Sequence, residues 1–309
     1  MSTTTLEPPR SPTQAALRIV CVVSFLNEEF HLRSFLSSMA RQERYPDLLI
    51  LVDDGSTDTS PTIAGEFAAG RRDTHLLRRA PRPRARDRLA RAAELHSFQW
   101  GLSKTDEPWD VAVKMDADLE LSPDLFTTLE RAFLTSPDLG IAGAQLSVID
   151  PKTGKRVRER CPPQHVRGPT KFYRRACLEQ ISPVPPILGW DTIDEISARR
   201  HGWQTFSVAC TGGDTIHLRP TGSHDGRLRA QYRWGTCAYG IGQHPVWIGL
   251  SAVRRLGDRP HLMGSVAFLT GWCGAALRHR PRAARDVRAF GRREQLFIMR
   301  RIVRRMIHS

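Results

Sequence analysis

Several motifs that would identify a common class of nucleotide-binding or metal-binding protein are missing from the sequence. No Gly-x-Gly-x-x-Gly follows the first apolar segment, and no Gly-x-x-x-x-Gly-Lys-Ser/Thr occurs anywhere in the chain. Their absence argues against a dinucleotide-dependent enzyme and against a P-loop NTPase. The six cysteines are widely spaced and include no Cys-x-x-Cys pair, so neither a zinc site nor a disulfide framework is indicated. We therefore expect reduced thiols in a cytoplasmic protein.

Long apolar runs are missing as well. Residues 1–16 are polar and contain proline, with no basic stretch before a cleavable apolar segment, so we expect a disordered lead-in rather than a signal peptide. Residues 262–277 form an uncharged run that would cover only ~24 Å as a helix, less than the ~30 Å hydrocarbon core of a bilayer. The flanking arginines, with Trp247 and Trp272, favour a helix at the interface of an anionic membrane. The alternative is a hydrophobic helix in the protein's own core.

Acidic residues are scarce near the C-terminus, so the net charge of +14 is unevenly placed. Residues 251–309 carry fourteen arginines against three acidic residues, a net charge of +11. Such a charge attracts nucleic acid, anionic lipid and phosphorylated ligands without discriminating among them. The segment has none of the recognition motifs of nucleic-acid-binding proteins. We therefore expect an anionic membrane surface as a partner and no nucleic acid.

What is present begins with an alternation of strand and helix patterns. Residues 17–26 and 47–53 are apolar and rich in β-branched residues, as expected for buried strands. Each is followed by a helix signal, through about residue 40 and about residue 69. The second strand ends in Asp53-Asp-Gly-Ser-Thr-Asp, where the glycine supplies a turn. Acids at strand ends in a β-α-β-α pattern predict a parallel nucleotide-binding sheet.

The central feature of the sequence is an apolar run that ends in two aspartates. Residues 111–115 lead into Asp116 and Asp118, as expected where a buried strand stops. Ligands of α/β sheets bind beyond the carboxyl ends of the strands, and both carboxylates could hold one divalent cation that bridges a diphosphate. The alternative is an acidic turn before a helix that Ser122 and Pro123 would start.

A second informative stretch is residues 187–203. Asp191 precedes an expected helix that ends at Gly202. Asp191 and Asp194, three residues apart, have the spacing of a helix-capping arrangement. The alternative is a catalytic base held rigidly at the start of the helix beside Trp190.

Two further segments offer polar groups to a ligand. Residues 78–91 contain many arginines, which are typical of a solvated loop but which could also chelate phosphate oxygens. His217 and His224 bracket a Pro-Thr-Gly turn. A single histidine there would usually be structural, and the pair raises the expectation of a ligand role.

Four motifs in order resemble the family 2 glycosyltransferases of the GT-A fold. They are Val22-Val-Ser-Phe-Leu-Asn-Glu-Glu, Leu51-Val-Asp-Asp-Gly-Ser-Thr-Asp, Lys114-Met-Asp-Ala-Asp, and Gly189-Trp-Asp followed by Arg200-His-Gly-Trp. The resemblance covers about residues 17–220 and implies a mostly parallel α/β sheet flanked by helices. The stretch His217-Leu-Arg-Pro-Thr-Gly-Ser, with Tyr239-Gly-Ile-Gly-Gln-His-Pro, is similar to a bacterial branch involved in exopolysaccharide or other surface-glycan assembly.

The resemblance implies a nucleotide-sugar site with a divalent metal, Mg2+ or Mn2+. Asp53 or Asp54 would hydrogen-bond the nucleotide base, and Glu28 would lie near the base and ribose. Asp116 would face the ribose or a metal-bound water. The remaining donor-side roles fall to Asp118 as metal ligand, His217 completing the metal site, and Arg91 near the diphosphate.

The resemblance also places Asp191 at the position of the catalytic base. An acceptor hydroxyl has a pKa far above 7, so a carboxylate must take its proton as the anomeric carbon is attacked. One such displacement inverts the anomeric configuration. Trp190, Asp194 and Glu195 are candidates for the acceptor side, and Asp194 or Glu195 would be the base if Asp191 is not.

We therefore expect an inverting glycosyltransferase with three segments: residues 1–16, a GT-A domain over 17–225, and a helical, basic C-terminal extension over 226–309. Its partners would be a nucleotide-diphosphate sugar and a glycan or polyprenol-linked acceptor. It would lie peripherally on the inner face of the cell membrane. The alternatives are a metal-dependent nucleotidyltransferase and a non-catalytic nucleotide-binding scaffold.

Overall fold

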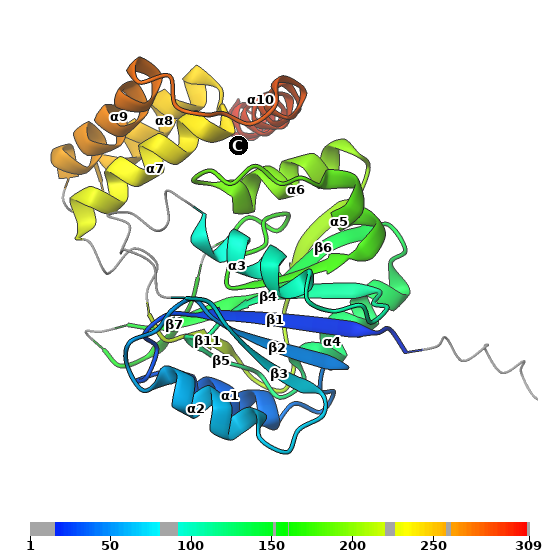
Figure 1. Cartoon of the computed structure of the whole chain (residues 1–309). Helices are drawn as coiled ribbons and strands as arrows, with labels where there is room; N and C mark the ends of the chain where they lie inside the picture. Colours follow the sequence, from blue (N-terminus) through cyan, green and yellow to red (C-terminus); the bar gives the residue numbers. More distant parts are fainter. Residues whose placement is uncertain are drawn as a thin grey trace, which may run out of the picture.

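The structure is a computed structural model that describes residues 16–80, 92–150, 153–159, 161–219, 226–257 and 261–307. A central sheet has helices on both faces, and four further helices lie over one of those faces (Figure 1). The expected α/β architecture with a mostly parallel sheet and a helical C-terminal extension is confirmed. The expected disordered lead-in falls almost wholly outside the described residues.

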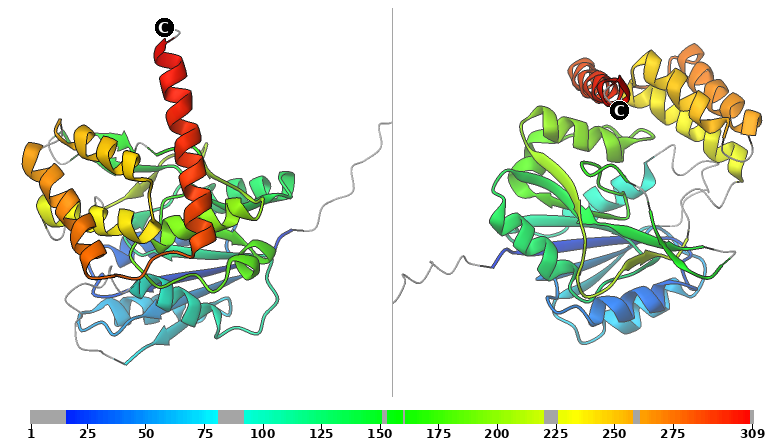
Figure 2. Two further views of the ribbon diagram at one scale, coloured as in Figure 1. Left: turned by 90° about the horizontal axis from the view of Figure 1, so that it is seen from above. Right: turned by 180° about the vertical axis from the view of Figure 1, so that it is seen from behind.

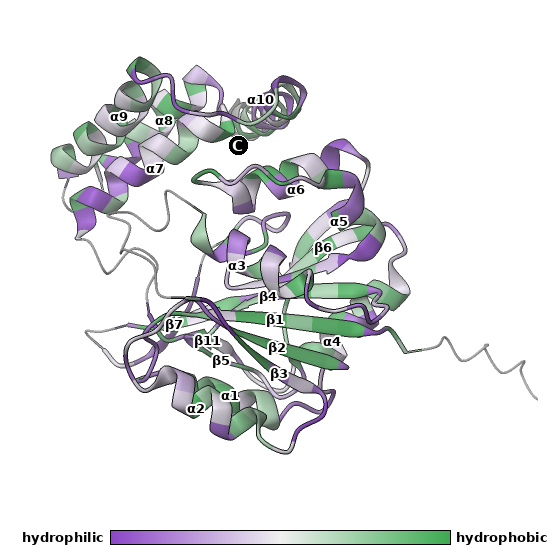
Figure 3. Ribbon diagram, in the orientation of Figure 1, coloured by the Kyte–Doolittle hydropathy of each residue, from purple (hydrophilic) through white to green (hydrophobic). Residues whose placement is uncertain are grey.

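A seven-stranded sheet forms the centre of the molecule, in the order β10-β6-β9-β4-β1-β2-β3. Neighbouring strands are parallel except at β9, which runs antiparallel to both β4 and β6. The inner strands are covered on both faces, which explains their nearly continuous apolar sequences (Figure 3). The strands are β1 Ile19–Phe25, β2 Leu48–Asp53, β3 Thr74–Arg78, β4 Val111–Asp116, β6 Leu139–Ala144, β9 Thr170–Arg174 and β10 Gln204–Val208.

A smaller sheet begins where β4 ends. Its order is β5-β11-β7-β8, with β5 Leu119–Glu120, β7 Leu146–Ile149, β8 Arg156–Arg158 and β11 Thr215–His217. β11 pairs antiparallel with β5, with His217 opposite Leu119. The N–H of Leu218 also donates to the carbonyl of Asp118 at 2.9 Å. This pairing holds the segment that follows β11 against the Asp-x-Asp turn.

Three helices pack on each face of the large sheet. Successive residues of a strand point to opposite faces, so Cys21 and Val23 join the core beneath α1, α2 and α4, while Val20 and Val22 join the core beneath α3, α5 and α6. The bounds are α1 Leu32–Ala40, α2 Ser60–Ala68 and α4 Leu125–Thr135 on one face, and α3 Ala93–Leu102, α5 Arg175–Ile181 and α6 Trp190–Arg200 on the other.

The C-terminal part consists of α7 Arg227–Ile241, α8 Pro245–Arg255, α9 His261–Leu277 and α10 Arg285–Ile307. α7 and α9 approach closely at two glycines. A Cβ on Gly235 would lie 1.9 Å from the Phe268 carbonyl oxygen, and one on Gly271 would lie 2.0 Å from that of Tyr232. The first part of α10 packs on α6, and its far end projects away from the rest of the protein (Figure 2).

The uncharged run of residues 262–277 forms α9 and has two different faces. Gly264, Phe268 and Gly271 are buried, whereas Leu262 and Val266 are more than half exposed. The buried face agrees with the interpretation as a core helix, and the interfacial helix stays a prediction for the exposed apolar face. None of the described helices is both long and apolar enough to cross a bilayer.

Some element boundaries differ from those expected. The apolar sequence of residues 141–149 predicts one strand, but the structure has two, β6 and β7, in different sheets. Gln145 lies between them, and its N–H donates to the Val208 carbonyl. The helix expected from Ser122 begins at Leu125, and the Ser122 hydroxyl instead donates to Asp124 at 2.5 Å. The capping interpretation of Asp191 is wrong, because α6 already begins at Trp190 and has no side-chain cap.

Candidate active site

The acidic residues at the strand ends meet at one edge of the large sheet. β1 lies between β2 and β4, and in the parallel register Phe25 is level with Asp53 while Ser24 is level with Asp116. Carboxyl ends of parallel strands meet at the same edge. The sheet thus brings the Asp-Asp-Gly-Ser turn and the Asp-x-Asp turn to either side of β1.

Asp53 pairs with Arg78, the last residue of β3, and Asp54 pairs with Arg79, which follows it. The buried carboxylate of Asp53 accepts a hydrogen bond of 2.7 Å from the N–H of Ser56, which closes the turn. It accepts a second hydrogen bond of 3.2 Å from Nε of Arg78. Asp54 accepts Arg79 at 3.2 Å, whose guanidinium lies 5.2 Å from the ring of Trp100. The first two arginines of the basic run therefore contact these acids, and residues 81–91 lie outside the described residues.

Glu28, Asp118, His217 and Arg219 form a second group, which we call the Asp118 cluster. Arg219 donates from Nε to Oδ2 of Asp118 at 3.0 Å and from a terminal nitrogen to Glu28. Nε2 of His217 lies 3.5 Å from the same Asp118 oxygen. Residues from three segments that are far apart in the sequence thus converge beyond β4.

The charges of the Asp118 cluster shift its ionisation. Burial acts to raise the pKa of Asp118, but the hydrogen bond and charge of His217, together with Arg219, outweigh it and lower the pKa to about 2. For His217, burial acts to lower the pKa, and Asp118 raises it. Burial raises the pKa of Glu28 in spite of Arg219. Asp118 is therefore ionised at neutral pH and able to bind a cation.

Asp116 is held by a buried lysine. Lys114 and Asp116 are two residues apart on β4, so their side chains share a face, and Lys114 donates to Asp116, to Glu94 at 3.3 Å and to the Gly168 carbonyl at 3.1 Å. Burial raises the pKa of Asp116 to about 6, although Lys114 opposes the shift. Asp116 is thus fixed at the strand end by an internal ion pair.

Asp191 lies in the first turn of α6 with a carboxylate that is only partly buried. Its Oδ2 packs against Gly168, where a Cβ would lie 3.1 Å away. Because Lys114 donates to the carbonyl of this glycine, Gly168 connects Asp191 with the ion pair of Asp116. The structure thus brings both predicted site residues near one glycine, Asp191 by direct packing and Asp116 through Lys114.

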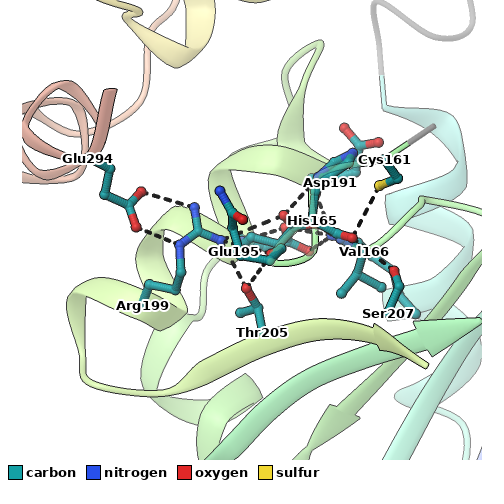
Figure 4. A network of polar contacts seen from close by, with 12 residues as sticks. Cys161, His165, Val166, Asp191, Glu195, Arg199, Thr205, Ser207 and Glu294 are labelled. Atoms are coloured by element: carbon teal, nitrogen blue, oxygen red, sulfur yellow. Dashed lines mark hydrogen bonds and ion pairs between the residues drawn. The ribbon is translucent and has the colours of Figure 1, made fainter. Parts of the chain in front are cut away.

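Asp194 and Glu195 are buried beneath the same helix. Lys171 on β9 lies 2.8 Å from both oxygens of Asp194 and 3.1 Å from Glu195. Glu195 also accepts from the N–H of Val166 at 3.0 Å and contacts Nδ1 of His165 at 2.8 Å (Figure 4). Burial acts to lower the pKa of Lys171, but Asp194 and Glu195 raise it. These carboxylates neutralise a buried lysine and anchor α6.

The buried ring of Trp190 packs against two lysines. The ring lies 5.9 Å from Nζ of Lys114 and 5.8 Å from Nζ of Lys171, and these lysines are paired residues on β4 and β9. The indole, next to Asp191 in the chain, therefore covers both internal ammonium groups.

The Asp118 cluster can accommodate a divalent metal in part. Mg2+ is commonly held by one or two carboxylates with substrate phosphates and water, and Asp118 and His217 offer a carboxylate and an imidazole side by side. Nδ1 of His217 is buried with no hydrogen-bond partner in the described part of the chain. Asp116, the third expected ligand, is instead engaged by Lys114. Among the described residues, no group of three or more His, Cys, Asp or Glu side chains is placed to bind a metal.

Comparison with known families decides the class of this site. Residues 20–186, more than half of the chain, match the model of the family described as "Glycosyl transferase family 2". The chain belongs to glycosyl transferase family 2. Both strand-end acid motifs and the Gly168 segment lie within the matched region. No curated protein matches the sequence.

Solved structures that resemble this family 2 chain include glycosyltransferases of low sequence identity. A mannosyltransferase from Pyrobaculum calidifontis, in complex with GDP-Man and Mn2+, aligns with a TM-score of 0.54 and 16% identity over 90% of this chain and 84% of that chain. GalNAc-T7 with UDP, GalNAc and Mn2+ aligns with a TM-score of 0.56 and 11% identity over 87% of this chain and 59% of that chain. Glucosyl-3-phosphoglycerate synthase from Mycobacterium tuberculosis aligns with a TM-score of 0.50 and 19% identity over 73% of this chain and 82% of that chain. These likenesses establish the GT-A fold, and with the family match they support a nucleotide-sugar glycosyltransferase.

Sequence reasoning missed three cations of this glycosyltransferase site. Lys114 lies two residues before Asp116 on β4, so alternation along the strand places both on one face, and Arg219 lies two residues after His217, just beyond the end of β11. That spacing was the available signal. Lys171 had none, because its partners Asp194 and Glu195 come from a separate element. The predicted diphosphate ligand Arg91 lies outside the described residues.

Proposed function

We propose that this protein is an inverting enzyme that moves a sugar from a nucleotide-diphosphate sugar to a hydroxyl of a glycan or lipid-linked acceptor in cell-surface polysaccharide synthesis. The observation that carries the proposal is the arrangement around Gly168. The carbonyl of Gly168 accepts from Lys114, which pairs with Asp116 at the strand edge that carries the acids at the ends of β2 and β4, and the partly exposed carboxylate of Asp191 packs against the same glycine.

The donor would occupy the strand edge. Asp53 and Asp54 would face the nucleotide base, and Glu28 and Asp116 its ribose, with Arg91 near the diphosphate. Asp118 and His217 would hold Mg2+ or Mn2+, which when bound neutralises charge on the leaving nucleoside diphosphate. The ionised state of Asp118, held by His217 and Arg219, supports this role.

Asp191 would accept the proton of the attacking hydroxyl. Of the three carboxylates on α6, only Asp191 is partly exposed. Asp194 and Glu195 are buried and form ion pairs with Lys171. Asp191 stands in the first turn of α6, and the N-terminal end of a helix favours a negative charge. Lys171 also donates to the Asp191 carbonyl, which fixes the helix start against β9 and leaves the carboxylate available to an acceptor beside Trp190.

Two variants of neighbouring residues test the assignment of the base. Asp191→Asn should lower kcat by ~10²-fold or more with donor affinity unchanged, because the amide cannot accept the proton. The matched variant Asp194→Asn should lower the free energy of unfolding instead. Retention of full turnover by Asp191→Asn would contradict the assignment. Release of pyrophosphate instead of a nucleoside diphosphate would identify a nucleotidyltransferase.

Binding experiments test the donor site independently of turnover. A ligand that binds only the folded protein raises its apparent stability, by about 2.7 kcal/mol at 100-fold saturation. Thermal shifts with UDP, GDP and their sugars, each with and without Mn2+, should show stabilisation by one nucleotide family that depends on the metal. The absence of any shift would exclude the donor-site assignment.

We further propose that the acceptor lies at the inner face of the cell membrane and that α8 and α9 contact its anionic surface. Val246, Leu250 and Val253 are exposed on α8, and Leu262 and Val266 on α9. Large exposed apolar patches mark interaction surfaces, and arginines beside them suit anionic headgroups. The cysteines of the described residues are free, as expected inside the cell.

Flotation with vesicles tests this surface. The chain should bind phosphatidylglycerol vesicles and bind phosphatidylcholine vesicles weakly. Val266→Asp should reduce binding by about tenfold or more, since a charge is placed against hydrocarbon. The control is Val157→Asp, at an exposed valine of β8, which should leave binding unchanged. Failure of the unaltered chain to float would exclude the membrane surface.

A further inference from the structure

Arg219 occupies an unusual position between two site carboxylates. Its Nε donates to Asp118 and a terminal nitrogen donates to Glu28, which come from the turn after β4 and the turn after β1. The guanidinium carries donors in a rigid fork, so one side chain can join both acids. The side chains of Glu28 and Asp118 are 13% and 12% exposed, so Arg219 neutralises charge that water reaches poorly.

The contact with Asp118 has a direct consequence for cation binding. Arg219 and His217 face the same oxygen, Oδ2 of Asp118. A positive charge on that oxygen opposes the approach of a divalent cation, since like charges repel strongly where water is partly excluded. Arg219 and a metal on Asp118 therefore compete.

We propose that Arg219 is the internal counter-ion of the donor site: it holds Glu28 and Asp118 together while no metal is bound, and it transfers its contacts to the donor diphosphate when a divalent cation binds Asp118. The inference rests on the proposed function. It assigns a role in donor binding to a residue outside the acid motifs.

The exchange follows from the balance of charge. Without a ligand, two carboxylates face one guanidinium, and the site needs no external cation. A divalent cation on Asp118 releases Arg219, whose planar donors match phosphate oxygens as well as carboxylates. The competition should lower metal affinity when no nucleotide is present, and the diphosphate should reverse it. Metal and nucleotide then bind with positive coupling, typically 5–150-fold for coupled sites.

Binding of Mn2+ alone tests the competition. The free-ion signal in electron paramagnetic resonance measures Mn2+ affinity without nucleotide and without turnover. Arg219→Ala should bind Mn2+ about tenfold more tightly than the unaltered chain, and its affinity for UDP or GDP in saturating Mn2+ should fall. Arg219→Lys, which keeps the charge but loses the fork, should lie between the two.

Two comparisons keep the outcomes distinct. Arg33→Ala removes an arginine that pairs with Glu66 at the surface, and it should change neither affinity. If Arg219→Ala and Arg219→Lys bind Mn2+ no more tightly than the unaltered chain, the competition is refuted. If the unaltered chain binds neither UDP nor GDP in the presence of Mn2+, the proposed function fails. The Mn2+ affinities of the unaltered chain and of Arg219→Ala, measured without nucleotide, still show whether Arg219 competes with the cation.

Discussion

Substitution of Lys171 by methionine should destabilise the protein strongly, since this lysine is a buried charge with two buried partners. Its Nζ lies 2.8 Å from both oxygens of Asp194 and 3.1 Å from Glu195, and all three side chains are at most 1% exposed. Methionine keeps much of the volume but none of the charge. The two carboxylates would then remain in the interior without their common cation.

The size of the effect follows from what remains around the two acids. Removal of one partner of a buried ion pair costs about 3–5 kcal/mol. Tyr173 still donates to Asp194, and the Val166 N–H still donates to Glu195. We therefore expect a loss of about 3 kcal/mol in the free energy of unfolding, which lowers the melting temperature by roughly 10 °C.

Urea unfolding followed by circular dichroism measures the loss. Adding Asp194→Asn to Lys171→Met should recover about 1–2 kcal/mol, because a neutral amide needs no counter-ion. The control Arg175→Met breaks an exposed pair with Glu179 and should cost under about 1 kcal/mol. An unchanged urea midpoint in Lys171→Met would refute the buried-pair reasoning.

Three further predictions concern other parts of the chain. Asp124 accepts from Ser122, from Thr211 and from the Gly212 N–H, which together outweigh burial and hold its pKa below the usual value. Asp124→Asn should cost about 2–3 kcal/mol at pH 7, and the difference from the unaltered chain should disappear as pH falls through the lowered pKa, as measured by urea midpoints from pH 7 to pH 2. Gly271→Val should separate α9 from α7, because its Cβ would meet the Tyr232 carbonyl, and hydrogen exchange should rise in α7–α9 while β1 stays protected; equal protection in both regions would contradict this. Cys273 is exposed, so a thiol reagent should label it before the buried Cys21, as mass spectrometry of peptides can show.

The strands expected over residues 17–26 and 47–53 are confirmed as β1 and β2, and the acids after them stand at the strand ends as predicted. The split of residues 141–149 into two strands was not visible in the sequence, because Ala144 and Leu146 continue one apolar pattern. The N–H of Gln145 still donates to Val208 of the large sheet, whereas the next strand, β7, pairs with β11 and β8 of the smaller sheet.

The α6 region shows the same limit of sequence-based prediction for the site residues. Asp191, Asp194 and Glu195 are equally acidic in the sequence, and spacing alone left each of them open as the base. The structure separates them by burial, since Lys171 from β9 lies beneath the helix and takes two of the three. The element that decides between them lies 20 residues or more away.

The sequence by itself determined the order of strands and helices, the placing of acids at strand ends and membership of family 2, since these depend on patterns over a few residues or on whole motifs. The tertiary structure alone decided how charges from separate segments are compensated: Arg219 lies between Glu28 and Asp118, and Lys171 pairs with Asp194 and Glu195. Ion pairing depends on distance and on exclusion of water. Both are set when separate segments pack together, so local sequence contains no record of them.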